Sequence, residues 1–267
     1  SMEYRWLDLK KMPVWIHCKG YLVRDDNMKP LYMIGCINEI GERQKADNVS
    51  GLLGETGFRQ YMEQQDTPLE TGYLLRIGID YFKEINDNFG QEYGDFVLRK
   101  TADCISGCIS EAQKVYKLVA DEFLILDVSS DEVKDADKLY DKVRNEIDRF
   151  IESNEFKVMY TVSGGIVPFA ALKGNQYSEA LKLTDFALNE AKKLGRNRCY
   201  IFNEETYRRF LRKREITQEL REAVNNGFRG FRAFYQPVFA EDKKVPYGAE
   251  ALMRFTSEKF GMVSPAE

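Results

Sequence analysis

The sequence predicts an α+β domain with a central mixed sheet flanked by helices. Between about 47 and 203, short apolar runs typical of strands alternate with amphipathic segments typical of helices. Two of the strands, 114–119 and 122–127, are separated by a tight turn at Ala120 and Asp121. Adjacent strands joined in this way form a hairpin, and a hairpin set among helices indicates a mixed sheet.

The remaining elements follow from the same periodicities. Strands are expected at 72–80, 114–119, 122–127, 158–167 and 199–202, and helices at 49–63, 83–88, 92–109, 131–152 and 178–194. Apolar positions spaced among many charges predict a further amphipathic helix over 205–227 that ends at Gly227.

The two ends of the chain show a different pattern. Residues 13–40 alternate apolar and polar side chains on both sides of a turn cluster at 25–27, which predicts an antiparallel pair of strands before a charged linker. Strand-like runs also occur at 231–239 and 245–255. With 267 residues, one complete domain and pieces of others are expected.

The composition is that of an ordinary globular protein, with 43% hydrophobic and 31% charged residues. A net charge of -4 gives no field that attracts nucleic acid, so local groups must hold any anionic ligand. No apolar run approaches the roughly 18 residues of a membrane span, and no signal peptide opens the chain. These features indicate a cytoplasmic protein.

The five cysteines are odd in number and contain no CxxC pair, which indicates reduced thiols. Cys104 and Cys108 lie four residues apart on a predicted helix. That spacing is compatible with a metal or redox pair, but no histidine is near them. Packing is therefore the favoured role.

Three polar segments carry the candidate chemistry. The first runs from Gly78 to Asp95 and places acids, amides and three glycines directly after a buried strand. The second is the acidic pair Asp121 and Glu122 at the hairpin tip. Each segment has a simpler interpretation, as a capped loop or as solvated turn residues. If the hairpin lies beside the strand that ends at Asp80, the acids of both segments are placed to share Mg²⁺ and a triphosphate.

The third segment lies at 191–198, where a predicted helix ends at Gly195 and exposes several cations. Lysines at the negative end of a helix are also ordinary capping residues. Phosphate binding is the more specific interpretation.

In this order and at this spacing, the three segments resemble the GGDEF family of diguanylate cyclases. The resemblance covers 47–203 and includes the entry segment 47–52, Asp-Asn-Val-Ser-Gly-Leu. It implies a palm-like domain that binds GTP with Mg²⁺, and a homodimer that joins two GTP molecules into cyclic di-GMP.

The resemblance also implies roles for individual residues. Guanine would be recognised by Asn86 and Asp95, and the phosphates by Lys83, Lys192, Arg196 and the backbone amides of Tyr81 and Phe82. Asp121 would hold the metal and Glu122 would be its catalytic neighbour, with Asp80 as a weak substitute for a second metal ligand.

The chain departs from the family pattern where metal and triphosphate should meet. Gly78 stands at the first acid of the D-x-D-x-F-K motif, and Val119 and Ala120 replace the two signature glycines. Further departures are Gln91 for the usual histidine, and Ser110 and Gln113 for the arginine and aspartate of the product-inhibition motif. We therefore expect a GTP-binding regulatory domain, with a weak cyclase and a non-binding structural relay as alternatives.

The flanking segments resemble parts of two other families. The strands before residue 47 resemble the end of a PAS sensor domain, and the residues from 231 resemble the start of an EAL phosphodiesterase. In the latter, Glu250 would match a metal ligand, with Gln236 and Arg254 near the substrate. A barrel of that kind needs roughly 250 residues, so this portion is expected to hydrolyse nothing alone.

The expected organisation is a PAS-like end and linker at 1–46, a degenerate GGDEF domain at 47–204, a linker helix at 205–230 and an EAL fragment at 231–267. An EAL domain in the same chain is the implied partner.

Overall fold

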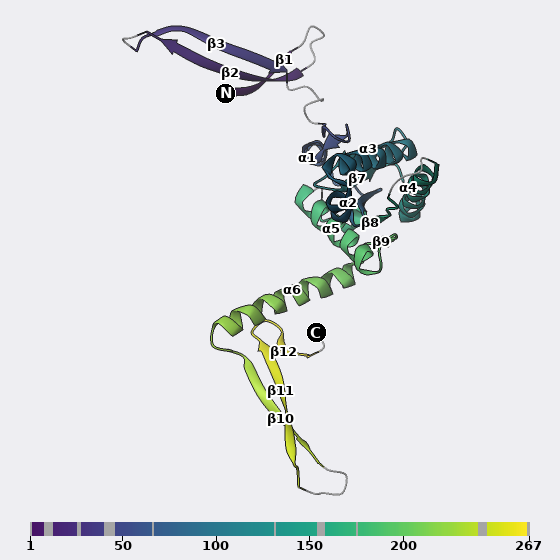
Figure 1. The fold of residues 1–267 in the computed structure, drawn as a ribbon. Coiled ribbons are helices and arrows are strands. Elements are labelled where there is room, and N and C mark those ends of the chain that lie inside the picture. The colour runs from purple at the N-terminus through teal and green to yellow at the C-terminus, as the bar shows by residue number, and fades with distance from the viewer. Residues whose placement is uncertain are drawn as a thin grey trace. The chain divides into compact units, whose positions relative to one another are not determined.

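The structure, a computed structural model, describes residues 2–7, 13–25, 28–39, 46–65, 67–130, 132–153, 158–174, 176–239 and 245–265 (Figure 1). The chain divides into two compact units, Ser1–Phe202 and Asn203–Glu267. Among the described helices, none has the length and apolar character needed to cross a membrane.

The first unit contains a six-stranded sheet. Its spatial order is β4 (Leu53–Gly54), β6 (Gln113–Lys117), β7 (Glu122–Asp127), β5 (Tyr73–Ile79), β8 (Val162–Pro168) and β9 (Cys199–Ile201). The outer pairs β4–β6 and β8–β9 are parallel and the inner pairs are antiparallel. The predicted mixed sheet with a central hairpin, β6–β7, is confirmed.

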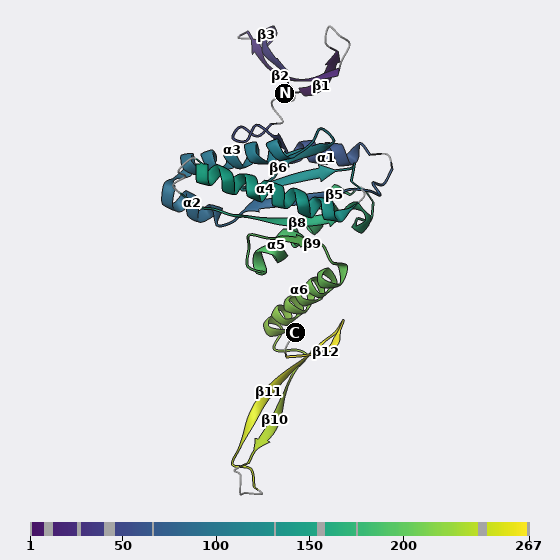
Figure 2. The ribbon, with the colours of Figure 1, turned by 90° about the vertical axis from the view of Figure 1, so that its right-hand side faces the viewer.

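Helices cover both faces of this sheet. They are α1 (Glu55–Glu63), α2 (Phe82–Phe89), α3 (Gln91–Cys108), α4 (Val133–Ser153) and α5 (Tyr177–Lys193), with a short 3₁₀ turn at Phe169–Ala171. Figures 1 and 2 show α4 and α5 on opposite sides of the strands. Because side chains alternate along β5, Leu75 and Ile77 pack with α3 and α4, whereas Leu74 packs with α1.

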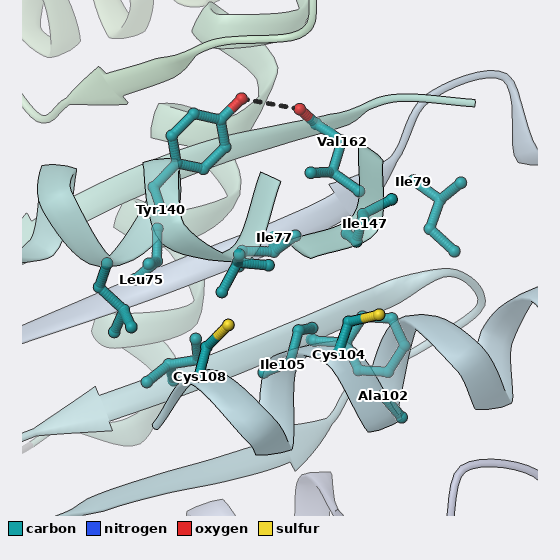
Figure 3. Close-up of a cluster of buried hydrophobic side chains, with 14 of the residues drawn as sticks. Leu75, Ile77, Ile79, Ala102, Cys104, Ile105, Cys108, Tyr140, Ile147 and Val162 are labelled. Carbon is teal, nitrogen blue, oxygen red and sulfur yellow. Dashed lines mark hydrogen bonds between the residues drawn. The ribbon is translucent and has the colours of Figure 1, made fainter. Parts of the chain in front are cut away.

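The core between β5, α3 and α4 contains two of the cysteines (Figure 3). Cys104 and Cys108 are buried free thiols among apolar side chains, which confirms that they pack. Burial raises the pKa of Cys104 to about 11, so the thiol stays protonated at neutral pH. Beside them, the Tyr140 hydroxyl donates to the Val162 carbonyl at 2.8 Å.

The first helix of the domain begins later than predicted, at Glu55 instead of residue 49. The Asp47 carboxylate accepts hydrogen bonds from the backbone N–H groups of Val49 and Ser50, at 3.2 and 2.7 Å. Gly51 then turns the chain at a φ of +73°. This turn and the two-residue strand β4 occupy the residues that we had assigned to the helix.

The predicted strand pair near the N-terminus is confirmed and has a third member. Strands β1 (Met2–Leu7), β2 (Pro13–Arg24) and β3 (Pro30–Glu39) form an antiparallel sheet in the order of the chain. The prediction missed β1, and part of the predicted linker, 40–45, lies outside the described residues.

The second unit consists of α6 (Glu204–Asn225) and the antiparallel strands β10 (Phe231–Val238), β11 (Gly248–Ser257) and β12 (Gly261–Val263). The Asn203 side chain caps the predicted helix by accepting from the Thr206 N–H at 2.9 Å. Ile216 of α6 packs against Phe255 and Val263 of the strands.

The three EAL-like residues lie on one face of the β10–β11 pair. Gln236 is directly opposite Glu250, and Arg254 follows four residues along the same strand. An even spacing along a strand keeps side chains on one face. The structure therefore places Gln236 beside Glu250, while Arg254 lies about 13 Å further along the same face.

Candidate nucleotide site

The register of β5 and β7 brings the first two polar segments together. Gly78 is directly opposite Glu122, and the Ile79 N–H donates to the Asp121 carbonyl at 3.4 Å. The end of β5 and the hairpin tip are thus neighbours, as the sequence prediction required. This is the centre of the candidate site.

Glu122 is held by an arginine for which the sequence analysis gave no role. Arg76 Nε donates to Glu122 Oε2 at 2.7 Å, and Nη2 contacts the same oxygen. Arg76 also donates to the Leu181 carbonyl at 3.2 Å and lies 3.4 Å from Asp185 on α5. Both members of the pair are largely buried, so this carboxylate already has a fixed cationic partner.

Lys192 lies over Gly78. A Cβ added to Gly78 would stand 3.1 Å from the Lys192 ammonium, which is itself 4.0 Å from Glu122 Oε1. Helix α5 reaches this position because Gly165 on β8 has no side chain, and a Cβ there would overlap the backbone of Ala187 and Leu188. The ammonium therefore occupies the neighbourhood of the missing carboxylate.

Of the two residues that replace the signature glycines, only one has a strained backbone. Ala120 has a φ of +55°, whereas Val119 is exposed and lies outside the left-handed region. Loss of two glycines at a hairpin tip predicts either a remodelled turn or one that crowds the nucleotide. The tight turn is instead retained, supported by the buried Lys117 ammonium, which donates to the carbonyls of Leu118 and Ala120.

Asp121 sits beside this turn. Burial raises the pKa of its carboxyl group, and the nearby Lys192 ammonium opposes the shift. Among the described residues, no group of three or more His, Cys, Asp or Glu side chains is placed to hold a metal ion.

Asp80 has a set of contacts of its own. Its fully buried carboxylate accepts from the hydroxyls of Thr161 and Ser163, at 2.7 and 2.8 Å, and from the Asn197 N–H at 3.2 Å. Arg196 Nε lies 4.0 Å away. These bonds fasten the loop after α5 to the ends of β5 and β8.

Backbone strain gathers around Asp80. Tyr81, Arg196 and Asn197 have φ values of +57°, +60° and +46°. Each left-handed residue costs about 1–2 kcal/mol, and such conformations concentrate at functional sites. The Arg196 guanidinium lies 4.4 Å from the centre of the Tyr81 ring, so the strained loop brings a cation to the first turn of α2.

Asn86 of α2 packs against α3 at Gly94, the residue before Asp95. A Cβ on Gly94 would overlap Asn86 Oδ1 and lie 3.3 Å from the Phe82 ring. Because Gly94 has no side chain, Asn86 and Phe82 can pack against α3. Asp95 follows directly and is half-buried. Gly94 is one of the three glycines of the first polar segment and was given no role of its own, although glycine inside a helix is unfavourable and signals a close approach.

The other predicted positions are less constrained. Lys83 and Gln91 are exposed at the start of their helices. Gln113 accepts from the Ser110 N–H at 2.9 Å and donates to Asp127 at 2.7 Å, so this pair has a structural role at the edge of the sheet.

A cavity of about 660 Å³ lies beside the site. It is lined by one face of α2 from Tyr81 to Phe89, by the end of α4, and by Val158 to Thr161, with Asp80 and Asn197 at its inner end. Asn86 and Asp95 do not line it. The candidate guanine contact Asn86 therefore lies on another face of α2, and Asp95 lies on α3.

The sequence from 45 to 198 matches the family model described as diguanylate cyclase, GGDEF domain, which covers more than half of the chain. The chain belongs to the GGDEF family. Among curated GGDEF relatives, it is 26% identical over 224 residues to the cyclic di-GMP phosphodiesterase NbdA of Pseudomonas aeruginosa, covering 82% of this chain and 28% of NbdA. It is 28% identical over 167 residues to the diguanylate cyclase DgcZ of Escherichia coli, covering 61% and 55%.

Solved GGDEF structures share the fold. The GGDEF domain of YfiN from Pseudomonas aeruginosa is 23% identical and superposes with a TM-score of 0.53, covering 62% of this chain and 99% of that one. The GGDEF domain of DgcB from Caulobacter crescentus, solved with cyclic di-GMP, is 23% identical with a TM-score of 0.51, covering 61% and 98%.

The chain spans less than a third of the length of the first curated relatives that it matches. GGDEF domains generally use Mg²⁺ with GTP. Here the ligand set fits that ion poorly, because Gly78 offers no carboxylate, Glu122 is paired with Arg76 and Asp80 is saturated with donors.

Proposed function

We propose that this GGDEF domain binds GTP as a regulatory ligand and forms little or no cyclic di-GMP. The observation that carries the proposal is the contrast between two halves of the site. Gly94 leaves room for the side chain of Asn86, a predicted guanine contact, while the carboxylate of Glu122 is already paired with Arg76. The predicted recognition residues are thus retained, whereas the carboxylate at residue 78 is missing and Glu122 is held by Arg76.

Three cations support phosphate binding in this proposal. Lys192 stands over Gly78, Arg196 lies over Tyr81, and Lys83 is exposed in the first turn of α2. The same turn presents backbone N–H groups at the positive end of the helix dipole. A triphosphate laid across the end of β5 would meet all of these groups.

The regulated partner in this proposal is a cyclic di-GMP phosphodiesterase domain in the same protein. The β10–β11 strands expose Phe234 on one face and Tyr235 and Met253 on the other, so both faces present apolar side chains to solvent. A relative, NbdA, is named a cyclic di-GMP phosphodiesterase. Homodimerisation, the PAS-like end and a cytoplasmic location stay predictions from the sequence.

A weak cyclase is the second candidate. The hairpin favours it, because the turn at Ala120 keeps Asp121 and Glu122 beside the end of β5. In this interpretation Asp121 and Asp80 would hold the metal ion, as the sequence resemblance implies.

Calorimetric titration with GTP and ATP tests the proposal. We expect saturable binding of GTP and at least about tenfold weaker binding of ATP, because a site built to hydrogen-bond one base rejects another that leaves polar groups unpaired. Asn86→Ala should weaken GTP binding, whereas Asn88→Ala, on the cavity face of the same helix, should leave it unchanged. Absence of GTP binding by the folded protein would favour a structural relay instead.

A further inference from the structure

We propose that the triphosphate of GTP is bound in this site without a requirement for Mg²⁺, with the Lys192 ammonium standing in for the metal. The inference rests on the proposed function, since it concerns how GTP is held. It arises from the poor fit between the residues around Gly78 and a divalent cation.

The first step concerns the position of Lys192. Its ammonium lies 3.1 Å from the point where the side chain of residue 78 would begin, directly opposite Glu122. In the family pattern, that side chain is a metal-binding carboxylate. The family pattern also has this lysine, but here no carboxylate at residue 78 offsets its positive charge, which disfavours a divalent cation in the same space.

The second step concerns the acids that remain. Glu122 is taken up by Arg76, and the three hydrogen bonds to Asp80 leave that carboxylate enclosed with a side-chain exposure of 0%. Of the acids that the resemblance names here, Asp121 remains. Mg²⁺ prefers six oxygen ligands in near-octahedral order, and one isolated carboxylate supplies little of that set.

The third step concerns charge balance with the ligand. In the family pattern, acids near the triphosphate require a divalent cation between them and the phosphates. Here Arg76 compensates Glu122 within the protein, and Lys192, Lys83 and Arg196 carry positive charge. Arginine and lysine bind phosphate oxygens directly through charged hydrogen bonds. The site thus offers the triphosphate cations that belong to the protein.

The test compares GTP titrations in a buffer with millimolar Mg²⁺ and in the same buffer with EDTA. We expect the two dissociation constants to agree within about threefold. A loss of tenfold or more in EDTA would overturn the inference and leave the proposed GTP-binding function intact. Absence of GTP binding in both buffers would instead overturn the proposed function itself.

Substitutions on helix α5 and strand β5 test the roles of Lys192 and of the missing carboxylate at residue 78. Lys192→Met should weaken GTP binding at least about tenfold in both buffers, whereas the adjacent Lys193→Met, whose side chain pairs with Glu190, should change neither. The double variant Arg76→Met/Gly78→Asp frees Glu122 and restores a carboxylate, so its GTP binding should become at least about tenfold dependent on Mg²⁺. If the folded double variant still binds GTP equally well with and without Mg²⁺, the pairing of Glu122 and the missing carboxylate at residue 78 do not explain why the ion is not required.

Discussion

Arg76 and Glu122 form an ion pair across the neighbouring strands β5 and β7, with Arg76 Nε 2.7 Å from Glu122 Oε2. The two side chains are only 12% and 18% exposed, so solvent screens their attraction weakly. They come from positions 46 residues apart in the sequence. The pair links the edge of the nucleotide site to the centre of the sheet.

A double-mutant cycle should detect this link. We predict a coupling free energy of at least about 1 kcal/mol between Arg76→Met and Glu122→Gln, measured by urea denaturation. The exposed pair Arg149 and Glu146 on α4, changed to Met and Gln in the same way, should couple by less than about 0.5 kcal/mol. Equal coupling free energies for both pairs would show that burial does not strengthen the Arg76–Glu122 pair.

Gly94→Ala should displace the side chain of Asn86, the predicted guanine contact, because the new Cβ would overlap Asn86 Oδ1. We expect at least about tenfold weaker GTP binding by calorimetry. Gly107→Ala on the same helix α3 is the control, since its Cβ would meet nothing within 4 Å. That change should raise the free energy of unfolding by up to about 1 kcal/mol and leave GTP binding unaltered. Unchanged GTP binding by the Gly94 variant would contradict the proposed role of Asn86 in recognising guanine.

Ala120→Gly should stabilise the domain by about 0.5–1 kcal/mol. A left-handed alanine costs about 1–2 kcal/mol, and glycine removes this strain. Glycine also has more conformational freedom in the unfolded chain, which reduces the net stabilisation. Val119→Gly should bring no gain, because Val119 lies outside the left-handed region. Urea denaturation of both variants measures the difference. Equal effects at the two positions would contradict the turn geometry.

The Asp127 carboxyl group should make the stability depend on pH. Although burial alone would raise its pKa, hydrogen bonds from Gln113 and Ser129 lower it below the ordinary value. A lowered folded-state pKa gives stability that is fully present above the unfolded value of about 3.9 and is lost as the pH falls further.

Comparison with Asp127→Asn isolates this contribution. At pH 7 the variant should be less stable by about 1–3 kcal/mol, because the donors of Ser129 and Ser130 lose a charged acceptor. The gap should narrow as the pH falls below about 3.9. Urea midpoints between pH 3 and 7 measure it, and a gap that widens in acid would refute the pKa direction.

Much of the fold could be predicted because its signals are local. The nearly continuous apolar run of β5 and the apolar faces of α3 and α5 identify a strand and two helices within one stretch of chain each. Strands β4 and β12 were missed because two or three residues are too few to show a period. The start of α1 was misplaced because the turn at Asp47 has the polar residues of a helix start.

The site was predictable only as a set of residue types. The resemblance named Lys192 and Glu122 but not their partners. Arg76 reads as an ordinary charge in a strand, and only the register of β5 and β7 places it against Glu122. The bonds of Asp80 to Thr161 and Ser163 likewise depend on β8, about 80 residues further along the chain. Such pairings arise from sheet topology and leave no pattern in the sequence.

Product analysis tests most directly the claim that this domain binds GTP and forms little or no cyclic di-GMP. Purified protein is incubated with GTP and Mg²⁺ at concentrations that saturate the site, and the nucleotides are separated by chromatography. We predict that GTP is recovered unchanged, with less than one cyclic di-GMP formed per protein over hours. Cyclic di-GMP accumulating over many turnovers would contradict the account and identify the chain as a working cyclase.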